Sequence, residues 1–191
     1  MTEPIHISIP SSIDTPRLIL RSFRVDDAPQ LHNALVESIN ELRKNLWFLP
    51  WVAEEQTLQS AEIRCLQAKE NFALRTDLPY LAIEKNTGRI VASIGLHRTN
   101  LTMRKTEVGY WVRSSATGKG FATEGVNAIT NRALAEPGIR RVELITDEQN
   151  LRSRAVAQRC GFTLEEINYN AEQAPDGSLR NNCIYIKESQ A

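Results

Sequence analysis

The chain has 191 residues, and its 23 Lys and Arg residues balance 23 Asp and Glu residues, so the formal net charge is zero. The length allows one sizeable core, and the charge balance gives no general attraction to nucleic acid or to an anionic membrane. No apolar run approaches the roughly 18 residues of a membrane span, and residues 1–16 lack the Lys or Arg of a secretory signal. Three scattered cysteines, Cys65, Cys160 and Cys183, predict neither a disulfide framework nor a zinc site. We therefore expect a cytoplasmic protein without a metal and without nucleic-acid or membrane partners.

The first part of the chain predicts an arm over residues 1–12, followed by one domain over 13–189. A β-type run covers 17–23, and Asp26 or Asp27 can cap a helix that has Pro29 in its first turn. The apolar stripe of this helix is Leu31, Leu35, Ile39 and Leu42. A loop rich in large apolar side chains follows at 46–51, and a second helix is expected over 54–75.

The pattern then changes to strands. A hairpin is expected from 80–83 to 89–94, and a third strand covers 105–113. A helix follows, marked by Ala122, Val126, Ile129 and Ala133. The last elements are a strand at 141–146, a helix at 151–160 and a hairpin of strands at 162–168 and 183–187 around the loop 174–177. The order β-α-α-β-β-β-α-β-α-β-β predicts a single α/β domain with a mixed sheet.

The loop Thr117-Gly118-Lys119-Gly120, between a strand and a helix, suits a phosphate or pyrophosphate. Glycines permit a tight bend, and the free amides at a helix start point outward at the positive end of the helix dipole. The loop is not a nucleotide P-loop, because Arg113 stands at the position of the first glycine. It is not a dinucleotide fingerprint either, because Thr123 replaces the third glycine. Taken alone, a Gly-x-Gly turn is more often a helix entry than a ligand site.

A second segment lies about thirty residues downstream, where the strand at 141–146 passes into the next helix. Asn150 stands at this junction, where its side chain can cap the helix or reach a ligand. Ser153 follows one helical turn later and shares a face with Asn150. In isolation the two residues are a helix cap and a surface hydroxyl.

Together these segments resemble the GNAT superfamily of N-acetyltransferases, and in particular its RimJ/RimL branch. The resemblance rests on Val112-Arg113, on Thr117-Gly-Lys-Gly-Phe-Ala-Thr-Glu124, on Asn150-x-x-Ser153 and on Cys160-Gly-Phe162. Thr15-Pro-Arg-Leu-Ile-Leu-Arg21, Leu49-Pro-Trp51 and Glu107-Val-Gly-Tyr-Trp-Val112 match the same branch, so the similarity covers residues 13–188. One position departs from the pattern: the usual Gln or Arg at the start of the cofactor loop is Thr117.

The resemblance implies a GNAT-like sheet, mostly antiparallel and flanked by helices, that splays between its fourth and fifth strands. Acetyl-CoA is then the cosubstrate: its pantetheine arm pairs with the strand edge at 111–113, and its pyrophosphate rests on the amides of 118–123. The implied cofactor-binding residues are Trp111, Val112, Arg113, Gly118, Lys119, Gly120, Phe121, Ala122, Thr123, Asn150, Ser153 and Arg154. Homodimers are common in the group that the chain resembles, so the resemblance also implies a homodimer as one assembly of this chain.

The resemblance also implies direct attack of a neutral amine on the thioester, without a covalent enzyme intermediate. Many members of the family use a tyrosine to assist the thiolate, but Ala157 occupies that position here, so Ser153 is the candidate partner of the thiolate. Glu107 is the candidate general base and His97 its competitor. Trp51 and His97 are the candidate acceptor-binding residues. An N-terminal α-amine suits such a site, because it is far less basic than the amine of lysine.

Three functions remain open at this point. The first is acetylation of a protein or peptide N-terminus, as in ribosomal-protein acetyltransferases. The second is acetylation of a small amine by the same fold, and the third is a non-catalytic acyl-CoA sensor. An assay of acetyl-CoA consumption over a panel of amines and peptides separates them.

Overall fold

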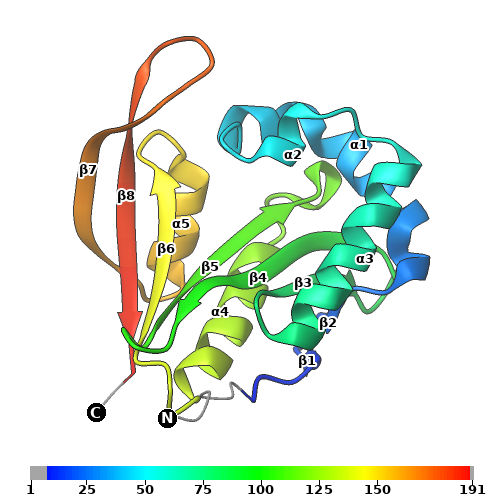
Figure 1. The fold of residues 1–191 in the computed structure, drawn as a ribbon, viewed down its shortest axis with the longest axis horizontal. Helices are drawn as coiled ribbons and strands as arrows, with labels where there is room; N and C mark the ends of the chain where they lie inside the picture. The colour runs from blue at the N-terminus through cyan, green and yellow to red at the C-terminus, as the bar shows by residue number, and fades with distance from the viewer. Residues whose placement is uncertain (1–7, 190–191) are drawn as a thin grey trace.

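The computed structural model describes residues 8–189, which form one eight-stranded sheet with helices on both faces (Figure 1). The first seven residues of the arm expected over 1–12 lie outside the described residues. The strands are β1 (Ser12–Asp14), β2 (Leu18–Ser22), β3 (Leu78–Glu84), β4 (Ile90–Asn100), β5 (Lys105–Val112), β6 (Arg141–Asp147), β7 (Thr163–Gln173) and β8 (Leu179–Glu188). The helices are α1 (Ala28–Asn45), α2 (Pro50–Ala53), α3 (Leu58–Leu74), α4 (Phe121–Leu134) and α5 (Leu151–Arg159).

The strands lie in the order β1-β2-β3-β4-β5-β6-β8-β7. Within the described part of the chain β5 and β6 run parallel, and every other neighbouring pair is antiparallel. The predicted α/β domain with a mixed, mostly antiparallel sheet is therefore confirmed. None of the helices in residues 8–189 has the length and apolar character needed to cross a membrane.

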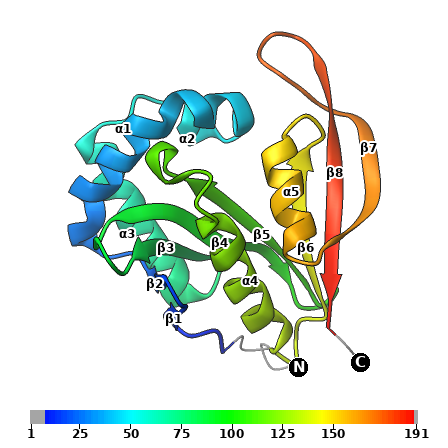
Figure 2. The same cartoon turned by 180° about the vertical axis from the view of Figure 1, so that it is seen from behind.

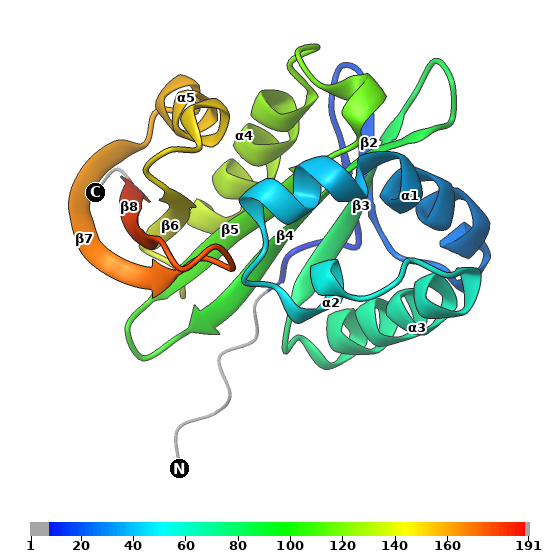
Figure 3. The ribbon, with the colours of Figure 1, turned by 90° about the horizontal axis from the view of Figure 1, so that it is seen from above.

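The helices form two layers because the sheet is apolar on both faces. Side chains that alternate along β3 separate accordingly: Tyr80 and Ala82 join the core under α4 and α5, whereas Leu81 joins the core under α1 and α3. Figure 2 shows α4 and α5 in front of the sheet, and Figure 3 shows α3 and α4 on opposite sides of it. The stripe predicted for the first helix packs as expected, with Leu31, Leu35 and Leu42 buried.

The sheet splits between β5 and β6. These strands pair at three positions, the last of which is Glu107 with Glu143. Beyond that pair β5 stays with β4 as far as Val112, and β6 stays with β8 as far as Asp147. Each strand follows its antiparallel partner, so the two halves of the sheet diverge and leave facing edges unpaired (Figure 1). This is the expected splay between the strands predicted at 105–113 and 141–146.

Several boundaries differ from the prediction. The helix expected over 54–75 begins at Leu58, because Thr57 and Ser60 cap it reciprocally, and Pro50–Ala53 forms a separate short helix. Strand β1 was not predicted; it pairs with β2, and Ile9 just before it is fully buried. The strands of the last hairpin extend further toward their turn than residues 168 and 183. The sequence did not predict this extension, because β7 is an exposed edge strand whose polar sequence lacks strand periodicity.

Candidate active site

The edge of β5 that faces the split offers free backbone groups. Arg113 N donates to Val91 O at 2.8 Å, and hydrogen-bonded pairs recur at every second residue of an antiparallel ladder. The register from Ala92–Val112 to His97–Glu107 is unbroken, so Glu107, Gly109 and Trp111 also direct their backbone groups toward β4. The amides of Tyr110 and Val112 consequently face the gap, where an extended ligand can pair with them.

The loop before α4 presents a row of free amides. Gly118 and Gly120 have φ of +76° and +80°, a conformation that side chains other than glycine rarely adopt. The first backbone bond of the helix runs from Glu124 N to Gly120 O, and within residues 8–189 the amides of 118–123 have no acceptor. Residues 117–120 are exposed, so these amides at the positive end of α4 are available to an anion.

Arg17 braces this loop from the start of β2. Its Nη1 donates to Lys119 O at 2.8 Å, its Nε bonds to Glu124 Oε2 at 2.6 Å, and its guanidinium lies 4.8 Å from the centre of the Phe121 ring. Burial raises the pKa of Glu124, but hydrogen bonds from Thr15 and Arg17 outweigh it, so the pKa is lowered overall. The sequence identified Arg17 only as part of a matching segment. Its contact with a loop about a hundred residues away has no local signature.

Asn150 and Ser153 lie at the start of α5, as expected. Asn150 Oδ1 accepts a hydrogen bond from Ser153 N at 3.1 Å, so Asn150 caps the helix. The Tyr110 hydroxyl donates to Ser153 Oγ at 3.0 Å, which links β5 to α5 across the split. Burial raises the pKa of Tyr110 to about 12, so this hydroxyl keeps its proton at neutral pH. Tyr110 was missed from sequence as a site residue, because its relation to Ser153 depends on the fold.

Three of the residues expected to bind the cofactor are cations, namely Lys119, Arg113 and Arg154, and their surroundings differ. Lys119 is exposed in the loop. The Arg113 side chain is buried and bonds through Nε to Glu37 Oε2 of α1 at 2.7 Å. Hydrogen bonds from Ser115 and from Arg113 hold the pKa of Glu37 down to about 2 despite some desolvation. Arg154 donates to the Tyr185 hydroxyl and to Glu148 O, each at 3.1 Å. Of the three, Lys119 alone extends from the loop itself.

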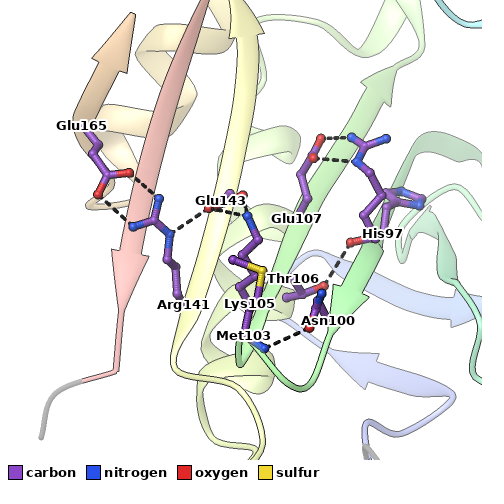
Figure 4. A network of polar contacts seen from close by, with 10 residues as sticks. His97, Asn100, Met103, Lys105, Thr106, Glu107, Arg141, Glu143 and Glu165 are labelled. Atoms are coloured by element: carbon purple, nitrogen blue, oxygen red, sulfur yellow. Dashed lines mark hydrogen bonds and ion pairs between the residues drawn. The ribbon is translucent and has the colours of Figure 1, made fainter. Parts of the chain in front are cut away.

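Glu107 and His97 form a cross-strand pair on the face of the sheet toward α1–α3. Glu107 is nearly buried and is held by both arms of Arg98, one of which bonds from Nε to Oε2 at 2.8 Å (Figure 4). Beside it, Glu143 accepts from Lys105 and from Arg141, and Arg141 also pairs with Glu165. A cavity of ≈ 270 Å³ opens here, at the base of the split, lined by Arg98, Glu107, Lys105, Glu143 and Ile145 among others.

Trp51 lies apart from these groups, in α2. Its ring is stacked by Arg64, whose guanidinium carbon is 4.3 Å from the ring centre, and Gln56 Nε2 donates to its carbonyl oxygen. Trp51 and Trp111 are both half-buried against the core shared by α1 and α3. Trp51 therefore belongs to the helical layer formed by α1, α2 and α3.

A split sheet, an unpaired strand edge and a loop of free amides are the geometry expected from the resemblance. A family model confirms the resemblance itself. The model, described as the acetyltransferase (GNAT) domain, matches residues 17–163. The chain belongs to the GNAT acetyltransferases. It is thus an acetyl-CoA-dependent acyltransferase, and the family expected from sequence is confirmed.

Individual relatives agree with this family. The Bacillus subtilis (strain 168) protein YdaF, named provisionally as a ribosomal N-acetyltransferase, is 29% identical over 152 residues, 78% of this chain and 79% of YdaF. The structure of the microcin C7 self-immunity acetyltransferase MccE, in complex with acetyl-CoA and AMP, has a TM-score of 0.85 at 22% identity and covers 96% and 99% of the two chains. The structure of RimL, the ribosomal L7/L12 alpha-N-protein acetyltransferase, in complex with coenzyme A, has a TM-score of 0.82 at 21% identity and covers 94% and 97%. At such identities the two structures establish a common fold.

Proposed function

We propose that this GNAT enzyme acetylates the N-terminal α-amine of a protein or peptide, with acetyl-CoA as the donor. The choice of acceptor rests on one observation, the hydrogen bonding of the Glu107 carboxylate, which lies on β5 beside the split. Both of its oxygens are engaged by Arg98, so it is poorly placed to remove a proton from a strongly basic amine. An α-amine, with a pKa near ~7.8, is already partly neutral at pH 7, whereas a lysine near ~10.4 is not.

The donor fits the residues that line the split. The free amides of residues 118–123 suit the pyrophosphate, and the exposed Lys119 adds a positive charge beside them. The outward-facing amides of Tyr110 and Val112 suit the pantetheine arm, and one of them can polarise the thioester carbonyl. Thr117 donates its hydroxyl to Ser114 O, so the residue that departs from the family pattern serves the turn rather than competing for the amides.

The role proposed for Ser153 follows from its partner. Because Tyr110 donates to Ser153 Oγ, the proton of Ser153 is free to point elsewhere, and we assign it to the departing thiolate. A serine hydroxyl is a weak acid, so it acts by hydrogen bonding as charge develops on sulfur. The similarity to YdaF and the fold shared with RimL support a protein N-terminus as acceptor.

The experiment is an acetylation assay in which three kinds of amine compete at equal concentration. They are a hexapeptide with a free N-terminus, the same peptide blocked at its N-terminus but carrying one lysine, and spermidine. Mass spectrometry should find acetate on the free N-terminus at least tenfold faster than on the other two. Preferred acetylation of lysine or of spermidine would overturn the proposed acceptor, and the second would favour a small-amine acetyltransferase. Binding of acetyl-CoA without any acetylated product would favour a sensor.

A further inference from the structure

His97 is the cross-strand partner of Glu107, and its side chain has a hydrogen-bond partner that the sequence did not identify. Its Nδ1 is 2.8 Å and 2.9 Å from the two carboxylate oxygens of Asp77, which precedes β3. An ionised carboxylate can only accept, so in the neutral imidazole Nδ1 carries the proton and Nε2 carries the lone pair. An imidazole held in this way by a carboxylate is oriented for taking up a proton at Nε2.

The imidazole ring of His97 lies against the sheet over two glycines, Gly95 and Gly109. A Cβ atom at Gly95 would lie 2.8 Å from His97 Nε2, and one at Gly109 would lie 3.0 Å from Cδ2. Gly95 and Gly109 are cross-strand partners, so two neighbouring positions without a side chain leave room for the imidazole against the backbone. The backbone thus has no side chain between Nε2 and the strand that borders the split. Gly109 is also the residue before Tyr110, whose amide faces the gap.

The alternative base on this face is engaged. Arg98 holds both oxygens of Glu107, whereas the part of the chain that the structure describes gives Nε2 of His97 no hydrogen-bond partner. The His97 side chain is 30% exposed, so an acceptor can approach it. The charged groups that face it are Asp77 from the start of β3, Arg98 from β4 and Glu107 from β5.

We propose that His97 is the general base for the acceptor amine and that Asp77 is its positioning residue, an inference that rests on the proposed function. His97 Nε2 takes one proton from the acceptor ammonium, which leaves a neutral amine and an imidazolium paired with the Asp77 carboxylate. The amine nitrogen then bonds to the thioester carbon, and the carbon–sulfur bond breaks to release the thiolate. As the tetrahedral intermediate collapses, the nitrogen gives its second proton to solvent water, which leaves a neutral amide. The imidazolium also returns its proton to solvent.

The test compares His97→Ala, His97→Gln and Asp77→Asn with the whole wild-type chain, using the preferred amine from the competition assay. Both His97 variants should lose about tenfold in kcat/KM for the amine at pH 7, because about a tenth of an α-amine is neutral there without a base, and the Kd for acetyl-CoA should be unchanged. Added imidazole should restore activity to His97→Ala, whose cavity over Gly95 and Gly109 can hold it, but not to His97→Gln. Asp77→Asn should shift the acidic limb of the kcat/KM profile to lower pH, because no anion then stabilises the imidazolium. Asp176→Asn, in an exposed turn, is the matched control.

The outcomes are distinct. Retention of kcat/KM within threefold in both folded His97 variants would overturn the inference, and so would a loss that imidazole leaves unrepaired while circular dichroism stays native. If lysine or spermidine is the preferred amine, the proposed acceptor is wrong, but the His97 test proceeds unchanged with that amine. A wild-type chain that acetylates none of the amines would overturn both proposals. An unshifted pH profile in Asp77→Asn would remove Asp77 from the mechanism.

Discussion

The hydroxyl of Tyr110 lies 3.0 Å from Ser153 Oγ and joins the two halves of the divided sheet. Tyr110 belongs to β5, on one side of the split, and Ser153 to α5, which follows β6 on the other side. The pair is buried enough to raise the pKa of Tyr110 to about 12, so this hydroxyl keeps its proton over the working range of pH.

Removing either member of the pair should affect turnover more than binding. We expect Ser153→Ala to lower kcat about ten- to a hundredfold, or about 1.4–2.7 kcal/mol of barrier, because the contact to sulfur strengthens as the thiolate forms. Tyr110→Phe should lower kcat by about three- to tenfold, the worth of one neutral hydrogen bond. Steady-state kinetics with the preferred amine measures both, and calorimetry should show little change in the Kd for acetyl-CoA. If Ser153→Ala keeps the wild-type kcat, Ser153 does not assist the thiolate and is an ordinary helix-surface hydroxyl.

The glycine loop should be needed for cofactor binding. A Cβ atom at Gly120 would lie 3.3 Å from Arg17 Nη2. A glutamate there would bring a negative charge into the loop of free amides, so Gly120→Glu should abolish measurable binding of acetyl-CoA. Gly177→Glu is the matched control: Gly177 has φ of +84°, close to the +80° of Gly120, and open space around it. Calorimetry on both folded variants separates lost binding from backbone strain. Equal affinity in the two variants would remove the pyrophosphate from this loop.

Arg17 should contribute to cofactor affinity without touching the cofactor. Its bonds to Lys119 O and to Glu124 hold the loop at both ends, so Arg17→Ala should raise the Kd for acetyl-CoA about three- to tenfold, as expected when a site loses a charge-assisted contact that pre-orders it. Arg89→Ala, an exposed arginine in the turn between β3 and β4, should leave the Kd unchanged. An identical Kd in both variants would show that the loop is ordered without Arg17.

Glu124 should make stability dependent on pH in a defined direction. Its pKa is lowered in the folded chain: burial raises it, and the hydrogen bonds of Thr15 and Arg17 more than compensate. A carboxyl group whose pKa is lowered by folding stabilises the fold at pH values above its pKa in the unfolded chain. This contribution is lost as the pH falls through the pKa of the group in the folded chain. Glu124→Gln should therefore reduce the free energy of unfolding by about 1 kcal/mol at pH 7, and the difference should shrink toward zero in acid. Urea unfolding at pH 7, 5 and 3.5 measures this, and a difference that grows in acid would contradict it.

Much of the fold could be predicted from local patterns. The order of helices and strands, the tight loop at 117–120 and the capping position of Asn150 each depend on a few consecutive residues, which carry their own signals of periodicity, turn formation and capping. The family could be recognised from the same segments, because they carry residue types and spacings that are typical of it. The boundaries were less certain at exposed elements, where β7 has a polar sequence and α3 begins at a reciprocal cap.

Contacts between distant segments were decided by the tertiary structure alone. Tyr110 meets Ser153, Arg17 meets the loop at Lys119, and Asp77 meets His97, although each pair is separated by twenty residues or more. The sequence also proposed Glu107 as a base, because a carboxylate on a strand beside a cofactor is suited to that role. Only the packed sheet shows that Arg98 occupies this carboxylate while the neighbouring imidazole is held by a carboxylate of its own. A residue's type sets which protons it can exchange, and its neighbours in space set whether it is free to exchange them.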